Sequence, residues 1–295
     1  MIRMLRGGLS CAVMASVLLA SCGGRQREIA SKYPSLCIIK ESRVDSFLKR
    51  HGYSGSMHFE LRRNSNGSAL YITDLFGTAL VTISSDGTVE HHVKPGGLAY
   101  LNDRGEFVAW WDDNDGGVRF ATGDVCDVPR SGVDPGGEYF LWVGPKGARE
   151  IRATTNPTET LGKSRLPLEW IFARDGKVLA FARGRRKGPR PYTYEQYEIV
   201  CQRFRVDSDK VILEDEVHIL RPSPGPSPFI VEDADCQADL VLLKDIHDPP
   251  FSFRTSWFIY DLKTKELVRV GRAKRFALFL SEPGLVDLLG RRGTT

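Results

Sequence analysis

The stretch that decides the fold class reads Trp170-Ile-Phe-Ala-Arg-Asp-Gly-Lys-Val-Leu-Ala-Phe-Ala182. Two apolar runs flank the central pair Asp175-Gly176. This pair between apolar runs is a strong signal for a tight β-hairpin, because the turn needs positive φ angles. A second stretch, Ala99-Tyr-Leu-Asn-Asp-Arg-Gly-Glu-Phe-Val-Ala-Trp-Trp111, has the same order of apolar run, polar turn, glycine, charged residue and apolar triplet. The two copies predict that the β-hairpin is the repeating unit of this chain.

Outward from these copies, short runs rich in β-branched and aromatic side chains alternate with turn signals, which is typical of strands. The expected strands cover residues 57–63, 69–73, 79–83, 107–111, 139–143, 170–173, 178–182, 199–206, 211–220, 240–243 and 257–262. One short amphipathic helix is expected over residues 42–50, and a helical pattern returns only over residues 283–289. The sequence therefore predicts an all-β chain with a short N-terminal helix.

A looser third copy of the hairpin is Asp134-Pro-Gly-Gly-Glu-Tyr-Phe-Leu-Trp142. Together the copies resemble the TolB-type propeller repeat, a Pro-Asp-Gly-Lys hairpin followed by an aliphatic residue and Ala-Phe. The nearest match is Asp175-Gly-Lys-Val-Leu-Ala-Phe181, in which Arg174 replaces the family's proline, and the later part of the chain has no clean copy. The resemblance implies a β-propeller, and a period of roughly 40–50 residues implies about five blades. A β-sandwich or a divergent β-barrel built from the same hairpins remains the alternative.

The N-terminus has the three parts of an export signal. Arg3 and Arg6 supply positive charge, residues 9–20 are apolar or small, and Leu19-Ala20-Ser21-Cys22 ends the segment. The apolar run is shorter than the roughly 20 residues that a transmembrane helix needs. Its last four residues resemble the bacterial lipobox, which implies cleavage before Cys22 and a diacylglycerol on the cysteine thiol. An ordinary secretory signal with a chance cysteine is the alternative.

These features predict four parts of the chain. They are a lipoprotein signal peptide (residues 1–21), a tether with a short helix (22–55), a β-propeller-like domain (56–282) and a C-terminal tail (283–295). Gly23 stands where an aspartate would retain an enterobacterial lipoprotein at the inner membrane, so we expect a lipid-anchored envelope protein at the outer membrane, facing the periplasm. With 41 Lys and Arg against 37 Asp and Glu, the chain lacks the basic excess typical of nucleic-acid binders, and we expect no nucleic-acid partner.

Four cysteines remain after the leader and the lipidated position are set aside, namely Cys37, Cys126, Cys201 and Cys236. An even number in a compartment that permits oxidation predicts two disulfides, whose pairing the sequence does not choose. Buried free thiols are the alternative. No CxxC spacing occurs, which argues against a zinc site or a thioredoxin-like pair.

The densest set of oxygen ligands is the acidic run Asp112, Asp113, Asn114 and Asp115. Carboxylate and carbonyl oxygens are the ligands that calcium prefers, so this run is a weak candidate for a calcium site. The EF-hand spacing fails, because Gly117 falls where the fifth loop ligand should be. Asp and Asn are also ordinary turn residues, which is the alternative interpretation.

The strongest basic cluster follows the repeat hairpin and comprises Arg183, Arg185, Arg186, Lys187 and Arg190. Guanidinium groups fit phosphates and carboxylates, so the cluster is a weak candidate for contact with lipid headgroups, lipopolysaccharide or an acidic partner. A solvated loop with no binding role is the alternative.

The sequence lacks the common catalytic motifs that a spacing pattern can identify. The chain has neither GxSxG nor HExxH, and Gly162-Lys163-Ser164 lacks the first glycine of a phosphate-binding loop. We therefore favour a non-catalytic module that binds an envelope protein or a surface polymer, with no cofactor expected apart from calcium. The alternative is a propeller enzyme of glycoside hydrolase or lyase type, with carboxylates at its central channel.

Overall fold

The structure is a computed structural model. It describes residue 29 and residues 31–52, 59–64, 67–74, 80–84, 88–92, 99–102, 104, 106–112, 117–128, 132–186, 196–220, 229–247, 254–272 and 275–279. The signal peptide, Cys22 and the C-terminal tail lie outside these residues.

The chain divides into two compact units, Met1–Leu36 and Cys37–Thr295. In the described part of the first unit, the backbone N–H of Tyr33 donates to the carbonyl of Ile29 at 2.9 Å. The second unit holds helix α2 (Glu41–Arg50) and all the blades described below. The boundary that the sequence suggested, between residues 55 and 56, therefore falls inside this unit.

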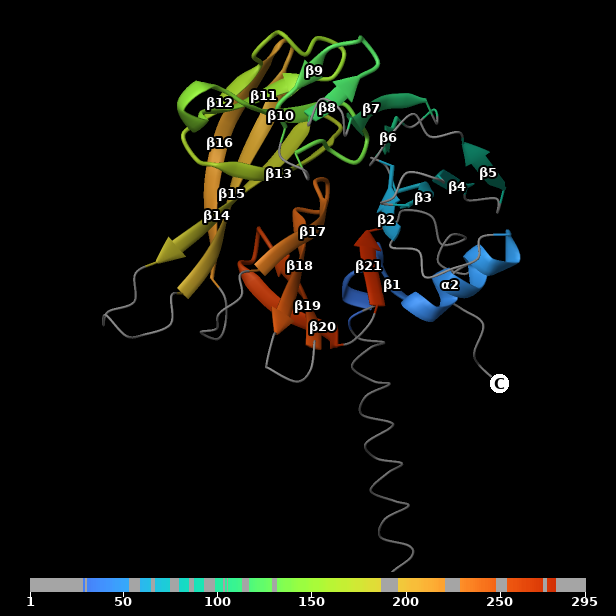
Figure 1. Cartoon of the computed structure of the whole chain (residues 1–295). Coiled ribbons are helices and arrows are strands. Elements are labelled where there is room, and N and C mark those ends of the chain that lie inside the picture. The colour runs from blue at the N-terminus through green and yellow to red at the C-terminus, as the bar shows by residue number, and fades with distance from the viewer. Residues whose placement is uncertain are drawn as a thin grey trace, which may run out of the picture. The chain divides into compact units, whose positions relative to one another are not determined.

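Five antiparallel sheets follow one another along the second unit (Figure 1). Blade 1 is β2 (Phe59–Arg63), β3 (Ala69–Asp74), β4 (Leu80–Ser84) and β5 (Val89–His92); blade 2 is β6 (Ala99–Leu101), β7 (Phe107–Asp112), β8 (Gly117–Phe120) and β9 (Val125–Cys126). Blade 3 is β10 (Tyr139–Val143), β11 (Arg149–Ala153) and β12 (Gly162–Ser164), with a 3₁₀ turn at Pro145–Gly147. Blade 4 is β13 (Leu168–Arg174), β14 (Lys177–Arg186), β15 (Gln196–Asp207) and β16 (Lys210–Leu220); blade 5 is β17 (Phe229–Asp235), β18 (Leu240–His247), β19 (Arg254–Asp261) and β20 (Glu266–Arg272). The fold is a five-bladed β-propeller, so the predicted all-β class, blade number and short helix are confirmed.

The repeat hairpin forms as its sequence predicts. Arg174, which ends β13, pairs with Lys177, which begins β14. Asp175 and Gly176 form the turn between them, with φ angles of 48° and 76°. Both angles are positive, as a two-residue hairpin requires. Glycine meets this need without steric cost, and aspartate tolerates it better than most side chains.

The first and last strands of the chain form a sheet of their own, separate from the blades. β1 (Leu36–Lys40) pairs with β21 (Arg275–Phe279), and the two strands lie side by side in Figure 1, blue against red. β21 contacts both β17 of blade 5 and β2 of blade 1. Among the described strands, every blade consists of consecutive segments, so this closing sheet is where the two ends of the propeller are joined.

Apolar clusters hold neighbouring blades together, since burial of apolar surface is the main favourable term in folding. One cluster lies between blades 4 and 5, a second between blades 3 and 4, and a third between blades 2 and 3. The cluster between blades 1 and 2 is small and centres on Tyr71 and Leu101. Helix α2 buries Val44, Phe47 and Leu48 in the core of blade 1.

Candidate functional site

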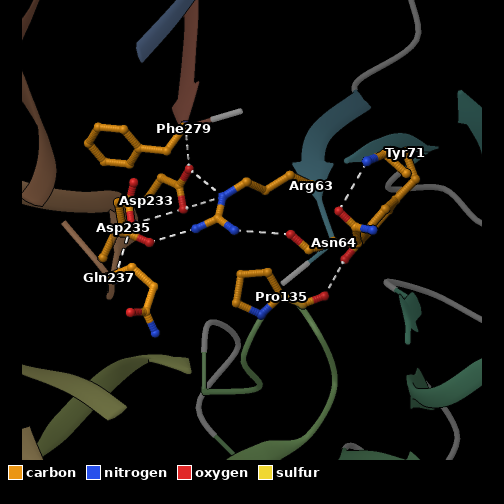
Figure 2. Close-up of polar contacts among 10 residues, drawn as sticks. Arg63, Asn64, Tyr71, Pro135, Asp233, Asp235, Gln237 and Phe279 are labelled. Carbon is orange, nitrogen blue, oxygen red and sulfur yellow. Dashed lines mark hydrogen bonds and ion pairs between the residues drawn. The ribbon is translucent and has the colours of Figure 1, made fainter. Parts of the chain in front are cut away.

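Among the described residues, the most deeply buried charged pair joins the last blade to the first (Figure 2). Arg63, at the end of β2, directs its Nε to both carboxylate oxygens of Asp233 on β17, at 3.1 and 2.9 Å. The Nη1 group of Arg63 donates to the carbonyl of Asn64 at 3.0 Å, and Nη2 donates to the carbonyl of Ala234 at 2.6 Å. Each nitrogen of the guanidinium therefore has an acceptor.

The carboxylate of Asp233 also anchors the closing strand. The backbone N–H of Phe279, on β21, donates to Oδ2 at 2.8 Å, and the N–H of Ala234 donates to Oδ1 at 2.8 Å. Arg63 is 6% exposed and Asp233 1%. We call Arg63, Asp233 and the N–H of Phe279 the closing cluster, because they tie together blade 1, blade 5 and β21.

Electrostatics keep the Arg63 guanidinium charged in spite of its burial. Burial by itself lowers the pKa of Arg63, but the adjacent Asp233 carboxylate, together with Cys236 and Asp235, outweighs burial, so the pKa of the guanidinium is raised above its ordinary value. The cluster therefore holds the two ends of the propeller together.

A second buried carboxylate, Asp134, organises the turn that enters blade 3. Its Oδ1 accepts the N–H of Gly136 at 2.9 Å, and its Oδ2 accepts the N–H groups of Glu138 and Tyr139 at 2.6 and 2.7 Å. Burial raises the pKa of Asp134 to about 7, although the three N–H groups act in the opposite direction. Nearby, Gly137 has φ 68° and lies against the side chain of Val108, where a Cβ would not fit.

This turn contacts blade 1 through Tyr71, whose hydroxyl donates to the carbonyl of Pro135 at 3.0 Å (Figure 2). Burial raises the pKa of Tyr71 well above its ordinary value, so the hydroxyl stays protonated and can donate. Blades 1 and 3 are thus linked near the closing cluster.

Asp239 forms a third buried charge cluster, between blades 4 and 5. Its carboxylate lies 3.2 Å from Arg203 Nη2, 3.2 Å from Lys263 Nζ and 3.9 Å from Lys177 Nζ. Asp239 is 1% exposed and has φ 59°. Its role is to connect the hairpin turn of blade 5 with the strands of blade 4.

The predicted basic cluster is only partly within the described residues. Arg183 is exposed on β14, forms an ion pair with Glu169 at 2.9 Å and covers the ring of Trp170 at 5.1 Å. Arg185 and Arg186 end β14 and pair with Tyr197 and Gln196 of β15. Lys187 and Arg190 lie outside the described residues. The structure places Arg183, Arg185 and Arg186 on blade 4, and the binding role of the cluster stays a prediction.

The predicted calcium site lies mostly outside the described residues. Asp112 ends β7 and pairs with Gly117, whereas Asp113, Asn114 and Asp115 are not described. Within the part of the chain that is described, no group of three or more His, Cys, Asp or Glu side chains is placed to hold a metal ion. A metal at the acidic run is still a prediction.

The disulfide prediction differs from the structure, in which Cys37, Cys126, Cys201 and Cys236 are all free. Cys37 lies in the core of blade 1 and Cys126 on blade 2, while Cys201 and Cys236 lie in the cluster between blades 4 and 5 without a bond between them. Burial raises the pKa of Cys236 to about 12 and that of Cys201 well above its ordinary value. The cysteines thus serve as small apolar side chains, which was the alternative interpretation.

Sequence reasoning did not identify Arg63, Asp233 or Asp239. Nothing local distinguishes these residues from other charged positions on strands and turns. Asp134 did carry a signal, since Asp-Pro-Gly-Gly is a turn motif in which the aspartate accepts nearby backbone N–H groups. That motif was interpreted only as a copy of the hairpin repeat.

No protein-family model matches this chain, and no curated protein matches it in sequence. Its likenesses are to solved propellers. The β-propeller domain of Cps50 (Swd1) from Myceliophteria thermophila has a TM-score of 0.41 at 13% identity, over 76% of this chain and 75% of that one. The β-propeller domain of the Trilobed protease from Pyrococcus furiosus, described as having an open velcro topology, has a TM-score of 0.37 at 14% identity, over 73% and 72%.

Among the other likenesses are acylaminoacyl peptidases, which are longer proteins. The enzyme from Pyrococcus horikoshii has a TM-score of 0.31 at 10% identity, and the alignment covers 74% of this chain but 33% of the peptidase. This chain thus spans about a third of that enzyme. All these likenesses concern the propeller fold alone.

Proposed function

We propose that this protein is a lipoprotein of the bacterial cell envelope. In this proposal a lipid on Cys22 holds the chain to a membrane, and the propeller is a non-catalytic module that binds an envelope protein or a surface polymer. The observation that carries the proposal is the ordered N-terminal pattern of Arg3 and Arg6, an apolar run and Leu19-Ala20-Ser21-Cys22, followed by a propeller.

The buried polar groups support a binding role over a catalytic one. The closing cluster, the Asp134 turn and the Asp239 cluster each use their charges on partners within the protein. A binding surface would then be formed by exposed side chains and turns at the rim of the blades, where propellers and other rigid scaffolds present variable loops. On blade 4, the exposed Arg183 and its basic neighbours are the candidates for an acidic partner.

Membrane attachment rests on the lipid in this proposal. No helix among the described residues has the length and apolar character needed to cross a bilayer. A single acyl chain binds membranes only marginally, whereas two or more chains anchor a protein stably. A diacylglycerol on Cys22 meets that requirement, and Gly23 supports sorting to the outer membrane.

Metabolic labelling with an alkyne analogue of palmitate tests the anchor. We expect the wild-type chain to take up the label and to fractionate with outer membranes. Cys22→Ala should lose the label, whereas Cys11→Ala, a matched control within the leader, should keep it. An unlabelled wild-type chain would refute the lipoprotein assignment.

Cross-linking in cells tests the binding role. Wild type and Cys11→Ala should yield the same discrete cross-linked species, and Cys22→Ala, which cannot reach the membrane, should not. A Cys22→Ala chain that folds, stays soluble and still forms that species would show that the anchor is dispensable for binding.

A further inference from the structure

Arg149 is a partly buried arginine at the seam between blades 3 and 4. It begins β11 and pairs in register with Ser164, the last residue of β12. Its Nε donates to the carbonyl of Leu168, the first residue of β13, at 3.0 Å. The arginine therefore lies against both ends of the connector Ser164–Leu168, which leads from blade 3 to blade 4.

The other two nitrogens of the Arg149 guanidinium have no acceptor among the described residues. Nη1 is shielded from solvent and makes no hydrogen bond, and Nη2 makes none to a described residue. In Arg63, by contrast, each guanidinium nitrogen has an acceptor. A shielded donor without an acceptor costs free energy. Because Arg149 as a whole is partly exposed, a ligand can reach its guanidinium from solvent through Nη2.

The charge of Arg149 also lacks a partner, since it forms no ion pair with a described carboxylate. The acidic side chains on the same strands are bonded to other cations. Glu150, on the opposite face of β11, lies 2.7 Å from Arg152. Glu169, near the start of β13, lies 2.9 Å from Arg183. A cation that is partly shielded from water and has no counter-charge attracts an anion more strongly than a fully solvated cation does.

The connector carries a second cation, Arg165, which is exposed and forms no ion pair with a described residue. Hydrogen bonds hold the backbone around it. Ser164 Oγ accepts the N–H of Leu166 at 3.0 Å, and the N–H of Leu168 donates to the carbonyl of Leu166 at 2.9 Å. The bond from Arg149 fixes the far end of the connector. Because the connector is ordered before a ligand arrives, binding there loses little conformational entropy.

We propose that Arg149 and Arg165 form a binding site for an oxyanion, the phosphate or carboxylate group of a ligand, at the connector between blades 3 and 4. A guanidinium presents its N–H donors in one plane, which fits the oxygens of both groups. Arg149 supplies the fixed donors and Arg165 adds an exposed charge. The site does not depend on a lipid at Cys22, and it lies outside the basic cluster that begins at Arg183.

NMR of the arginine side chains in the full chain tests the site, with inorganic phosphate and acetate as separate probes at constant ionic strength. We expect at least one probe to shift the Nε–H signal of Arg149 in a saturable way, with the signal assigned by comparison with Arg149→Lys. Saturation by phosphate, by acetate or by both supports the site and identifies the group that it binds. No saturable shift with either probe would overturn the proposal.

Calorimetric titration of variants with the same probe assigns the binding to these residues. Arg149→Gln should weaken binding about tenfold, as the loss of a charged hydrogen bond predicts. Arg165→Gln, a change at an exposed position, should weaken it about threefold, and this variant decides the matter if Arg149→Gln does not fold. Arg183→Gln is the matched control and should bind as wild type does.

The control also separates this site from the basic cluster of blade 4. Binding that is lost in Arg183→Gln and unchanged in Arg149→Gln would overturn the site and assign the probe to that cluster.

Discussion

Two contacts between blades differ in chemistry, the one between blades 4 and 5 and the one that closes the propeller between blades 5 and 1. The first is an apolar cluster to which all four strands of blade 4 contribute, and it includes Phe181, Ile199, Leu243 and Phe258. The second combines the closing sheet of β1 and β21 with a buried ion pair, Arg63 with Asp233, whose members are 170 positions apart in the chain.

The difference shows what each contact must achieve. Blades 4 and 5 are consecutive, so the chain already brings them together, and non-directional burial is sufficient. The two ends of the propeller have no such help. A buried ion pair adds little net stability compared with an apolar pair of similar volume, but it penalises every arrangement in which one charge lacks its partner. The closing cluster therefore favours one geometry of closure over the alternatives.

The largest effect is expected for Arg63→Ala, which leaves the carboxylate of Asp233 buried without its cation. Removing one member of a buried pair costs about 3–5 kcal/mol. Urea denaturation should show this loss in the free energy of unfolding. The double variant Arg63→Met, Asp233→Leu should recover most of it, and a double variant as unstable as Arg63→Ala would contradict the ion-pair explanation.

Leu243→Ala tests the apolar contact at a residue that is 0% exposed in the cluster between blades 4 and 5. A buried leucine truncated to alanine typically costs about 3 kcal/mol, through lost burial and a residual cavity. Hydrogen exchange should show lost protection in blades 4 and 5 while the closing sheet stays protected. Greater loss in β1 and β21 than in β18 would show that the two contacts are not separable.

Asp134→Asn should cost about 2 kcal/mol, because the amide offers one acceptor oxygen and turns an NH₂ group towards backbone N–H donors. Thermal unfolding at pH 8 measures the change. Asp124→Asn, at an exposed turn of blade 2, is the matched control and should be nearly neutral. If both variants unfold alike, the three N–H bonds to Asp134 do not matter for stability.

Tyr71→Phe removes the hydroxyl that bonds to Pro135 and leaves that carbonyl without this donor. The expected loss is about 1 kcal/mol, measured by urea denaturation. Tyr260→Phe is the control, as a buried tyrosine in the cluster between blades 4 and 5. An unchanged Tyr71→Phe would mean that the link between blades 1 and 3 rests on packing alone.

A separate effect is a dependence of stability on pH that comes from Asp134. Its pKa is about 7 in the folded chain, against an ordinary value of 3.8, so between these values the folded state binds more protons than the unfolded state. This contribution to stability is present at low pH and is lost as the pH rises from about 4 through about 7. The difference in the free energy of unfolding between wild type and Asp134→Asn, measured over this pH range, isolates the contribution of Asp134. A difference that grows with pH would reverse the assigned direction.

The sequence predicts the fold well where its signals are local. Asp175-Gly176 predicts its hairpin because the φ angles of two residues suffice to define the turn, and residues 42–50 predict α2 from the spacing of Val44, Phe47 and Leu48. The closing strands β1 and β21 were not predicted. Leu36-Cys-Ile-Ile-Lys40 has strand-like composition, but its partner lies at the other end of the chain, and pairing at that distance leaves no local pattern.

The candidate site was less predictable for the same reason. Arg63 ends β2 and Asp233 lies within β17, and both are ordinary strands. Only the folded chain brings Arg63 Nε within 2.9 Å of Asp233 Oδ2. The disulfide prediction differs from the structure because it rested on an even cysteine count and an expected oxidising compartment, neither of which gives the positions of the thiols.

The pairing of β1 with β21 has a consequence for how such chains can change in evolution. No described blade borrows a strand from the opposite end of the chain, so a blade corresponds to one continuous stretch of gene. Duplication or deletion of such a stretch would add or remove a complete blade and leave both closing strands intact. The number of blades would then be limited by whether β1 can still pair with β21 and whether Arg63 can still contact Asp233.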